Sequence, residues 1–204
     1  MALVFACHKN ISPLNEIRYE QCRKTWTKHS EALQTLRASG TLYVSQNGKR
    51  TAALNTDLLV SNATKIYAQV NAVGFPSTVL SVSNEVLTIF QPNKGIAYRA
   101  QHSKDTSNVL DIAVSWTTLI NIFLGDFKDL TIERFSKQCQ PKRAKFNTGE
   151  VLEWQDHGFK LCKGDRWIKW KYDRIEKNPD LKENWFELEL PQSVQFLDNP
   201  IGLR

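Results

Sequence analysis

The four cysteines and four histidines are the residues of this 204-residue chain with the most versatile chemistry. The cysteines stand at positions 7, 22, 139 and 162, without the Cys-x-x-Cys spacing of zinc ribbons and thioredoxin-like redox sites. Cys139 and Cys162 could form a disulfide in an oxidising compartment, or each could be a small buried hydrophobic residue. The histidines contain no His-Glu-x-x-His pair, so no metal site is predicted.

Short-range catalytic motifs are also missing from the sequence. It contains no Gly-x-Ser-x-Gly elbow, no phosphate-binding loop and no Gly-x-Gly-x-x-Gly turn. Where a carboxylate adjoins an aromatic residue, as in Glu153-Trp154, strand alternation places the two on opposite faces of a sheet. We therefore predict that the protein is not an enzyme and needs no cofactor.

The charge of the chain favours acidic partners. Its net charge is +6 and its pI is near 9.1, although the basic residues are dispersed. In the segment 166–172, Trp167 falls on the same face as Lys169 and Lys171, while Ile168, Trp170 and Tyr172 fall on the other. This pattern favours a core strand with a basic outer face. Single-stranded nucleic-acid binding is the less favoured alternative.

The first seven residues resemble the end of a bacterial lipoprotein signal peptide. Small apolar residues and Ala6 precede Cys7, the position that would be acylated. The basic region and most of the apolar stretch expected before it are absent, so the start has been trimmed or the match is accidental. On the first interpretation, residues 1–12 form a lipid-anchored tether to a single domain at 13–204.

A long amphipathic helix is predicted next. Ser12 suits an N-cap and Pro13 the first helical position, and amphipathic residues recur at helical spacing as far as Leu36. Gly40 follows where such a helix would end. One face is apolar, so this helix should lie on another element.

From Thr41 onward the period changes to two residues, which predicts strands separated by turns. A second helix interrupts them, because Trp116, Leu119, Ile120, Phe123 and Leu124 share one helical face between Ser115 and Gly125. The predicted strands are 42–45, 50–54, 57–60, 65–70, 78–82, 85–91, 96–100, 150–155, 159–163, 166–172, 184–190 and 194–197.

The pattern therefore indicates a mainly β protein with two helices and about eleven strands in an antiparallel barrel. A barrel of that size has more internal space than its own side chains fill. The two helices could plug this space, or a ligand cavity could lie beneath them. The sequence leaves both possibilities open.

The segment from Arg37 to Gly125 resembles the LolA/LolB lipoprotein-localisation family, and its LolB branch most closely. The resemblance lies in four stretches, at 36–44, 66–78, 87–98 and 112–125. In the second, Ala72 replaces an expected proline and Phe75-Pro76 adds bulk after Gly74. After Gly125 the likeness is limited to the spacing of the predicted strands and turns.

This resemblance implies a half-open antiparallel β-barrel, capped by helices, with a hydrophobic cavity for acyl chains. It further implies an outer-membrane receptor, anchored at the periplasmic face through acylated Cys7, that accepts acylated lipoproteins from a LolA-like periplasmic carrier. A soluble carrier or lipid-binding sensor with the same fold is the alternative. We expect a monomer whose only ligand is an acyl chain, with outer-membrane lipid as a partner and no nucleic acid.

Two sets of site residues follow from this hypothesis. A membrane-insertion loop is expected at Val73, Gly74, Phe75 and Pro76, with Val73 nearest the family's exposed leucine, although both bulky side chains could instead fold back onto the barrel. The hydrophobic cavity should be lined by Tyr67, Val82, Ile89, Trp116, Leu119, Ile120 and Phe123.

Overall fold

A computed structural model describes residues 16–62, 64–72, 75–83, 86–101, 116–127 and 130–197. Within these ranges, twelve strands form one sheet, in the order β12-β6-β5-β4-β3-β2-β1-β11-β10-β9-β8-β7. Neighbouring strands are antiparallel except β12, which pairs with β6 in parallel. The strands are β1 Thr35–Gln46, β2 Lys49–Ser61, β3 Lys65–Ala72, β4 Phe75–Ser83, β5 Val86–Gln91, β6 Ile96–Gln101, β7 Thr131–Phe135, β8 Pro141–Lys145, β9 Val151–Gln155, β10 Gly158–Lys163, β11 Arg166–Lys177 and β12 Gln195–Phe196.

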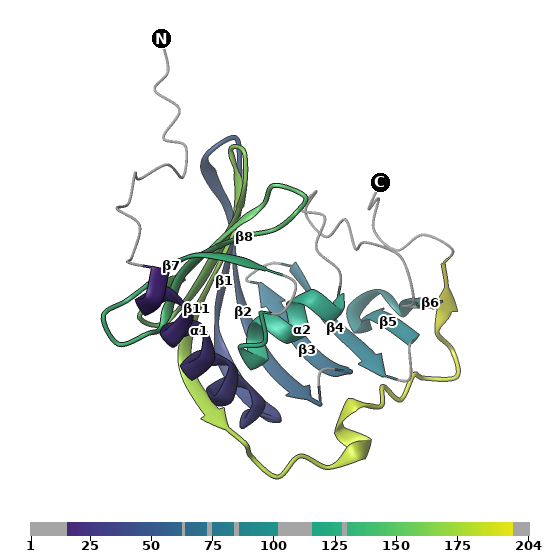
Figure 1. The fold of residues 1–204 in the computed structure, drawn as a ribbon. Helices are drawn as coiled ribbons and strands as arrows, with labels where there is room; N and C mark the ends of the chain where they lie inside the picture. Colours follow the sequence, from purple (N-terminus) through teal and green to yellow (C-terminus); the bar gives the residue numbers. More distant parts are fainter. Residues whose placement is uncertain are drawn as a thin grey trace.

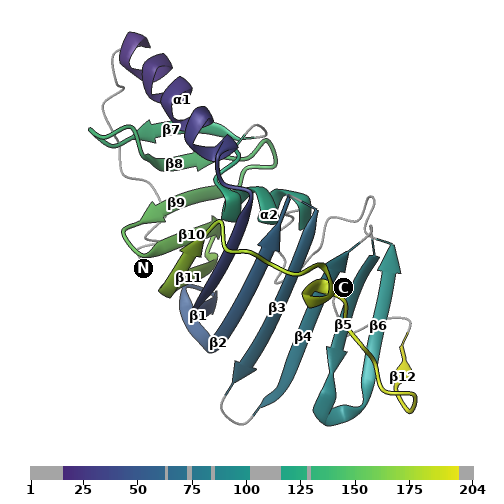
Figure 2. The same cartoon turned by 90° about the horizontal axis from the view of Figure 1, so that it is seen from below.

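The sheet is strongly curved and remains open, because its edge strands β7 and β12 do not pair with each other (Figures 1 and 2). Helix α2, Trp116–Leu124, lies inside the curve, and helix α1, Glu16–Glu31, lies beside the β7–β8 end. This arrangement confirms the predicted half-open antiparallel β-barrel with helices. No helix of the described ranges is both long and apolar enough to span a bilayer.

The sheet buries one face against α2, and we call this face concave. Cross-strand rows of apolar side chains cover it, and Leu36, Val60, Ile66 and Val82 form one such row. They belong to the same core cluster as Ile120 of α2. The opposite, convex face carries the alternate residues of each strand, as the period of two requires.

The short 3₁₀ helix η3, Glu183–Phe186, packs on the convex face of β3 and β4. Phe186 is buried there, its carbonyl accepts a hydrogen bond from Ser81 Oγ, and Glu183 pairs with Lys65. The predicted strand 184–190 is therefore wrong, since this segment crosses the sheet instead of joining it (Figure 2). Beyond it, β12 returns to the edge strand β6.

The N-terminal helix is shorter than predicted. It ends at Glu31, and β1 begins at Thr35, so Leu36 lies in a strand. Gly40 is not a helix stop but sits beside a register shift in the pairing of β1 with β11. A Cβ added to Gly40 would lie 2.2 Å from the Lys171 carbonyl oxygen. The close approach of the β11 backbone therefore requires glycine at this position.

The second helix agrees with its prediction. It runs from Trp116 to Leu124, and Gly125 follows with φ 74°, a conformation that suits glycine after a helix. Ser115, the predicted cap, lies outside the described residues. The spacing of apolar residues identified this helix because no strand alternation competes with it.

Two predicted strands, at 50–54 and 57–60, are joined in β2. Asn55 and Thr56 continue the pairing between them, opposite Thr41 and Gly40. Conversely, β7 and β8 are strands that the prediction missed. Their charged residues hide the alternation, because Arg143 of β8 is itself buried and donates hydrogen bonds to Glu133 and Glu153, both at 2.8 Å.

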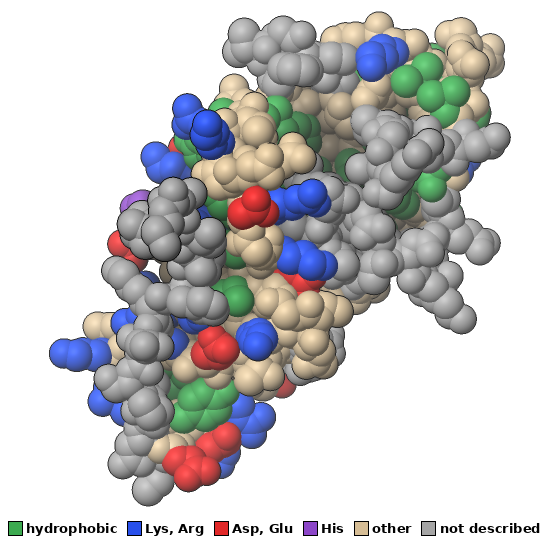
Figure 3. Space-filling model, turned by 90° about the horizontal axis from the view of Figure 1, so that it is seen from above, with side chains coloured by type: hydrophobic (Ala, Val, Ile, Leu, Met, Phe, Trp, Pro, Cys, Tyr) green, Lys and Arg blue, Asp and Glu red, His purple; other side chains and the backbone are tan. Residues whose placement is uncertain are grey.

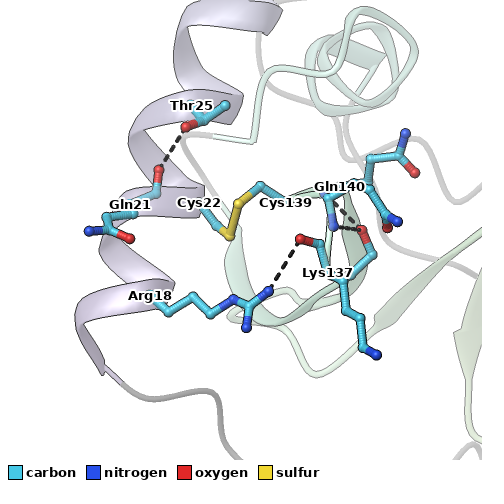
Figure 4. Close-up of a disulfide and its surroundings, with 9 residues drawn as sticks. Arg18, Gln21, Cys22, Thr25, Lys137, Cys139 and Gln140 are labelled. Carbon is cyan, nitrogen blue, oxygen red and sulfur yellow. Dashed lines mark hydrogen bonds between the residues drawn. A yellow bond between two sulfur atoms is a disulfide. The ribbon is translucent and has the colours of Figure 1, made fainter.

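A disulfide joins Cys22 of α1 to Cys139 in the turn between β7 and β8 (Figure 4). Of the two alternatives left open for Cys139 and Cys162, the disulfide between them does not form, and Cys162 is buried in β10 outside the disulfide. Two hydrogen bonds reinforce the disulfide. Arg18 donates one to the Lys137 carbonyl, and the Tyr19 hydroxyl donates the other to the Ile132 carbonyl at 2.7 Å. Helix α1 is thus fixed to the β7–β8 hairpin by covalent and polar contacts.

The carboxylate of Glu150 is fully buried, and neighbouring side chains compensate its negative charge. Its Oε1 lies 2.8 Å from Lys163 Nζ, and its Oε2 accepts a hydrogen bond from the Thr148 hydroxyl. Burial by itself would raise the pKa of Glu150, but the hydrogen bonds from Lys163 and Thr148 outweigh it and hold the pKa below its ordinary value of 4.5. The carboxylate is therefore ionised in the folded protein.

A pH dependence of stability follows from this lowered pKa. Because the folded pKa lies below the unfolded one, the contribution of Glu150 is fully present above about pH 4.5 and is lost as the pH falls through the folded pKa. We expect Lys163→Met to lower the free energy of unfolding by about 1–3 kcal/mol at pH 7, since a buried charge loses its partner. Urea unfolding should show this deficit shrinking below pH 4.5, and Lys163→Arg should retain most of the stability; a deficit constant with pH would contradict the assignment.

Candidate functional site: an apolar cleft between the helices and the sheet

A cleft of about 310 Å³ opens between α1, α2 and the concave face. Its walls are mostly apolar, with Trp26 and Leu33 from the α1 region, Phe123 from α2, and Tyr172 and Ile175 from β11. The volume lies at the small end of the range for ligand-binding pockets. We call this space the apolar cleft.

Aromatic rings in contact with one another form the wall of the cleft between α1 and β9. The Trp26 and Phe127 rings stack with centroids 5.7 Å apart, and Phe127 contacts the Trp154 ring of β9 at 4.6 Å. The Trp26 indole nitrogen also donates a hydrogen bond to the Gly125 carbonyl at 2.9 Å. These contacts join α1, the end of α2 and β9, so the cleft is bounded by elements far apart in sequence.

The inner wall of the cleft is built around Phe123. Its ring meets the Phe159 and Trp170 rings edge-on, at 5.4 and 5.3 Å. The Tyr172 phenol lies beside them, and burial raises its pKa far above the ordinary 10.0, so the group is uncharged at neutral pH. The inner wall therefore presents no charge to a ligand.

Polar groups are confined to the rim of the cleft. His29 and Ser30 come from α1, Asp156 and His157 from the turn between β9 and β10, and Lys177 from the end of β11. This division into an apolar interior and a polar rim suits an amphiphile whose chain enters the cleft and whose headgroup stays in water. The described residues contain no cluster of His, Cys, Asp and Glu that could hold a metal ion.

The structure distributes the seven predicted cavity residues over several places. Phe123 lines the apolar cleft, whereas Val82, Leu119 and Ile120 belong to the packed core beside it. Ile89 lies on the concave face but lines a separate hollow of about 150 Å³ near β6, together with Tyr98 and Leu197. Trp116 begins α2, and its side chain lies outside what the structure describes.

Tyr67 is on the other side of the sheet. It pairs with Leu59 and Ser81, whereas its neighbour Ile66 pairs with Val82 on the concave face. Tyr67 lines a polar groove of about 350 Å³ on the convex face, with Arg37 among its neighbours. The expectation that Tyr67 faces the same cavity as Val82 is therefore corrected, because adjacent strand residues point to opposite faces.

Sequence reasoning missed most of the residues that form the cleft. The sequence predicts an apolar face on the first helix, to which Trp26 belongs, and a core face that includes Tyr172, but nothing in the sequence brings these two faces together. The Trp26–Phe127 stack spans 101 positions of the chain. The sequence did contain one indication of the cleft: the two helices and the inner face of 166–172 each have an apolar side that needs a partner.

The proposed tether and loop fall largely beyond the described residues. Cys7 lies outside them, as do Val73 and Gly74. Phe75 and Pro76 open β4, and Phe75 pairs with Ala72 of β3. Proline is tolerated there because the first positions of a strand need not donate to the ladder. The expected loop 73–76 is therefore reduced to the two residues between these strands.

The open curved sheet with a helix inside it is a fold that this chain shares with several solved structures. A putative outer membrane lipoprotein-sorting protein domain from Vibrio parahaemolyticus is similar at 7% identity and TM-score 0.55, covering 84% of this chain and 97% of its own. A LolA superfamily protein from Nitrosomonas europaea is similar at 10% identity and TM-score 0.52, covering 82% and 97%.

A DUF1329 family protein from Desulfovibrio piger has the same fold, at 8% identity and TM-score 0.50, covering 86% of this chain and 98% of its own. No protein-family model matches the sequence. No curated protein matches it either. At these identities the likeness establishes the fold alone.

Proposed function

We propose that this protein binds acyl chains in the apolar cleft and transfers acylated lipoproteins to a membrane without covalent chemistry. The observation that carries the proposal is the cleft beside α1 and α2, with its apolar interior and polar rim, in a sheet whose fold is shared with a putative lipoprotein-sorting domain. Burial of an acyl chain contributes about 0.8 kcal/mol per CH₂. A continuous apolar path from one protein to the next, and then to the bilayer, avoids exposing the chain to water.

Within this proposal we favour the role of a LolB-like receptor. The protein would be held at the periplasmic face of the outer membrane by acylated Cys7 and would accept lipoproteins from a LolA-like carrier. The disulfide between Cys22 and Cys139 supports an oxidising compartment such as the periplasm. A LolA-like soluble carrier is the second candidate, because the fold is equally compatible with it and Cys7 is what separates the two roles.

A polar residue placed in the cleft tests the proposal. Ile175 lines the cleft and is 44% exposed, so Ile175→Glu should fold normally while placing a charge where the chain binds. We expect at least a roughly tenfold loss of affinity for a fluorescent fatty acid or acylated peptide, consistent with the 1.5–3 kcal/mol of an apolar side chain contact.

The matched control is Phe196→Glu, which also replaces an exposed apolar residue, 53% exposed, but lies on β12 away from the cleft. Its affinity should stay within about twofold of the original protein. Equal losses in both variants, or no uptake by the unmodified protein, would contradict acyl binding in this cleft.

A further inference from the structure

The excess positive charge of the protein is concentrated in one part of the sheet. Residues 131–177 carry twelve Lys and Arg against seven Asp and Glu, so they contribute +5 of the net +6. In Figure 3, Lys and Arg side chains lie interspersed with Asp and Glu over one half of the visible face. The surplus of positive charge therefore lies in one continuous segment of the chain, the segment that forms β7–β11.

Three of these lysines lie on the convex face of the sheet, together with Arg50 and two aromatic residues from neighbouring strands. The residues are Lys160 of β10, Trp167, Lys169 and Lys171 of β11, Tyr43 of β1 and Arg50 of β2, and we call them the basic face. Their register places Lys160 opposite Lys169, and Lys169 opposite Tyr43. Four adjacent strands span about 14 Å, so the array is wide enough to meet several anionic groups at once.

Two glutamates near this face are already paired with other cations. Glu153 is the partner of Lys160 across β9 and β10, but its Oε1 lies 2.8 Å from Arg143 Nη1. Glu150 pairs with Lys163, as described above. Among the described residues, no carboxylate lies within ion-pair distance of Lys160, Lys169 or Lys171. These three ammonium groups therefore lack a compensating anion within the described part of the protein.

The aromatic residues of the basic face already have cations over their rings. Lys160 Nζ lies 5.1 Å from the centre of the Trp167 ring, and the Arg50 guanidinium lies 5.5 Å from the centre of the Tyr43 ring. A cation over one face of a ring takes that face from stacking with a nucleic-acid base. Trp170, the other tryptophan of this strand, is buried on the concave face. Amphipathic rings flanked by lysines suit the headgroup region of a lipid bilayer instead.

We infer that the basic face docks the protein onto anionic phospholipid headgroups. The Lys171 row continues through Thr41 and Asn55 to Asn71, one residue before the end of β3. The basic face and the connection from β3 to β4 therefore occupy the same end of the sheet. The apolar cleft opens on the concave side, so docking through the convex face leaves it accessible.

The inference is tested by sedimentation with vesicles of phosphatidylcholine alone or mixed with phosphatidylglycerol, at low and high salt. The triple variant Lys160→Gln, Lys169→Gln, Lys171→Gln removes the unpaired cations. We expect it to lose roughly 100-fold in affinity for the anionic vesicles at low salt. Binding of the unmodified protein should be abolished by high salt and weak on phosphatidylcholine alone.

A matched control removes the same charge elsewhere, with Lys24→Gln, Lys137→Gln and Lys182→Gln, all of exposed residues. It should lose no more than roughly threefold. Equal losses in the two triple variants would overturn the inference, as would binding of an acidic polypeptide or an oligonucleotide in the absence of vesicle binding. Acyl-probe uptake by the basic-face variant should be unchanged, which separates failure of docking from failure of the proposed function.

Discussion

Replacing Cys22 and Cys139 together by serine should lower the free energy of unfolding by about 2–5 kcal/mol. The disulfide closes a loop across a sequence separation of 117 residues, and long loops lose the most entropy in the unfolded chain when they are cross-linked. Urea unfolding of the two proteins measures the difference directly. The variant should also bind the acyl probe more weakly, because α1 supplies Trp26 to the cleft and the connection that follows α1 supplies Leu33.

A reductant provides the matched control for this prediction. It should bring the unmodified protein down to the stability of the double serine variant while leaving the variant unchanged. If reductant lowers both proteins equally, or neither, the disulfide does not fasten α1 to the sheet in solution.

The second large effect is expected at the connection between β3 and β4. If Val73 and Phe75 enter lipid, each buried side chain contributes roughly 1.5–3 kcal/mol to insertion. Val73→Glu combined with Phe75→Glu should therefore reduce release of bound acyl probe into liposomes by roughly 100-fold or more. Unfolding and uptake should be unaffected, because the proposed contacts form only with the membrane.

A control with the same change in charge places glutamates in two other turns. Thr64→Glu with Asn147→Glu alters exposed residues away from this connection. Release by the control should match that of the unmodified protein. Loss of stability in the Val73 and Phe75 variant, with normal release, would instead mean that these side chains pack back onto the barrel.

Elements with one dominant periodicity could be predicted from the sequence. The second helix was predicted with correct bounds because five large apolar residues share one of its faces. The inner face of 166–172 was also correct, since Ile168, Trp170 and Tyr172 join the core cluster around α2. In both cases a local pattern of apolar side chains agrees with the tertiary packing.

The features that the sequence could not supply depend on distant partners. Gly40 resembles a helix stop until the β11 backbone is placed beside it. Arg143 resembles a surface residue until Glu133 and Glu153 are brought to its guanidinium. Likewise, the choice of Cys22 rather than Cys162 as the partner of Cys139 requires the position of α1 against the β7–β8 turn.

The dependence on distant partners also explains why most residues of the candidate site could not be predicted. Among the predicted cavity residues whose side chains the structure describes, only Phe123 lines the apolar cleft, because the cleft is defined by α1 as much as by the sheet. Alternation alone separates Tyr67 from Val82, but locating Trp26 and Phe127 opposite each other needs the three-dimensional arrangement.

The most direct test of the account is to locate a bound acyl chain with a spin-labelled fatty acid and measure nuclear relaxation along the backbone. We expect strong enhancement at Leu33, Phe123 and Ile175, which line the cleft, and none at Phe196 on the far edge of the sheet. A fatty acid that fails to bind, or that broadens residues outside the cleft while sparing these three, would contradict the claim that the cleft is a lipid-binding site.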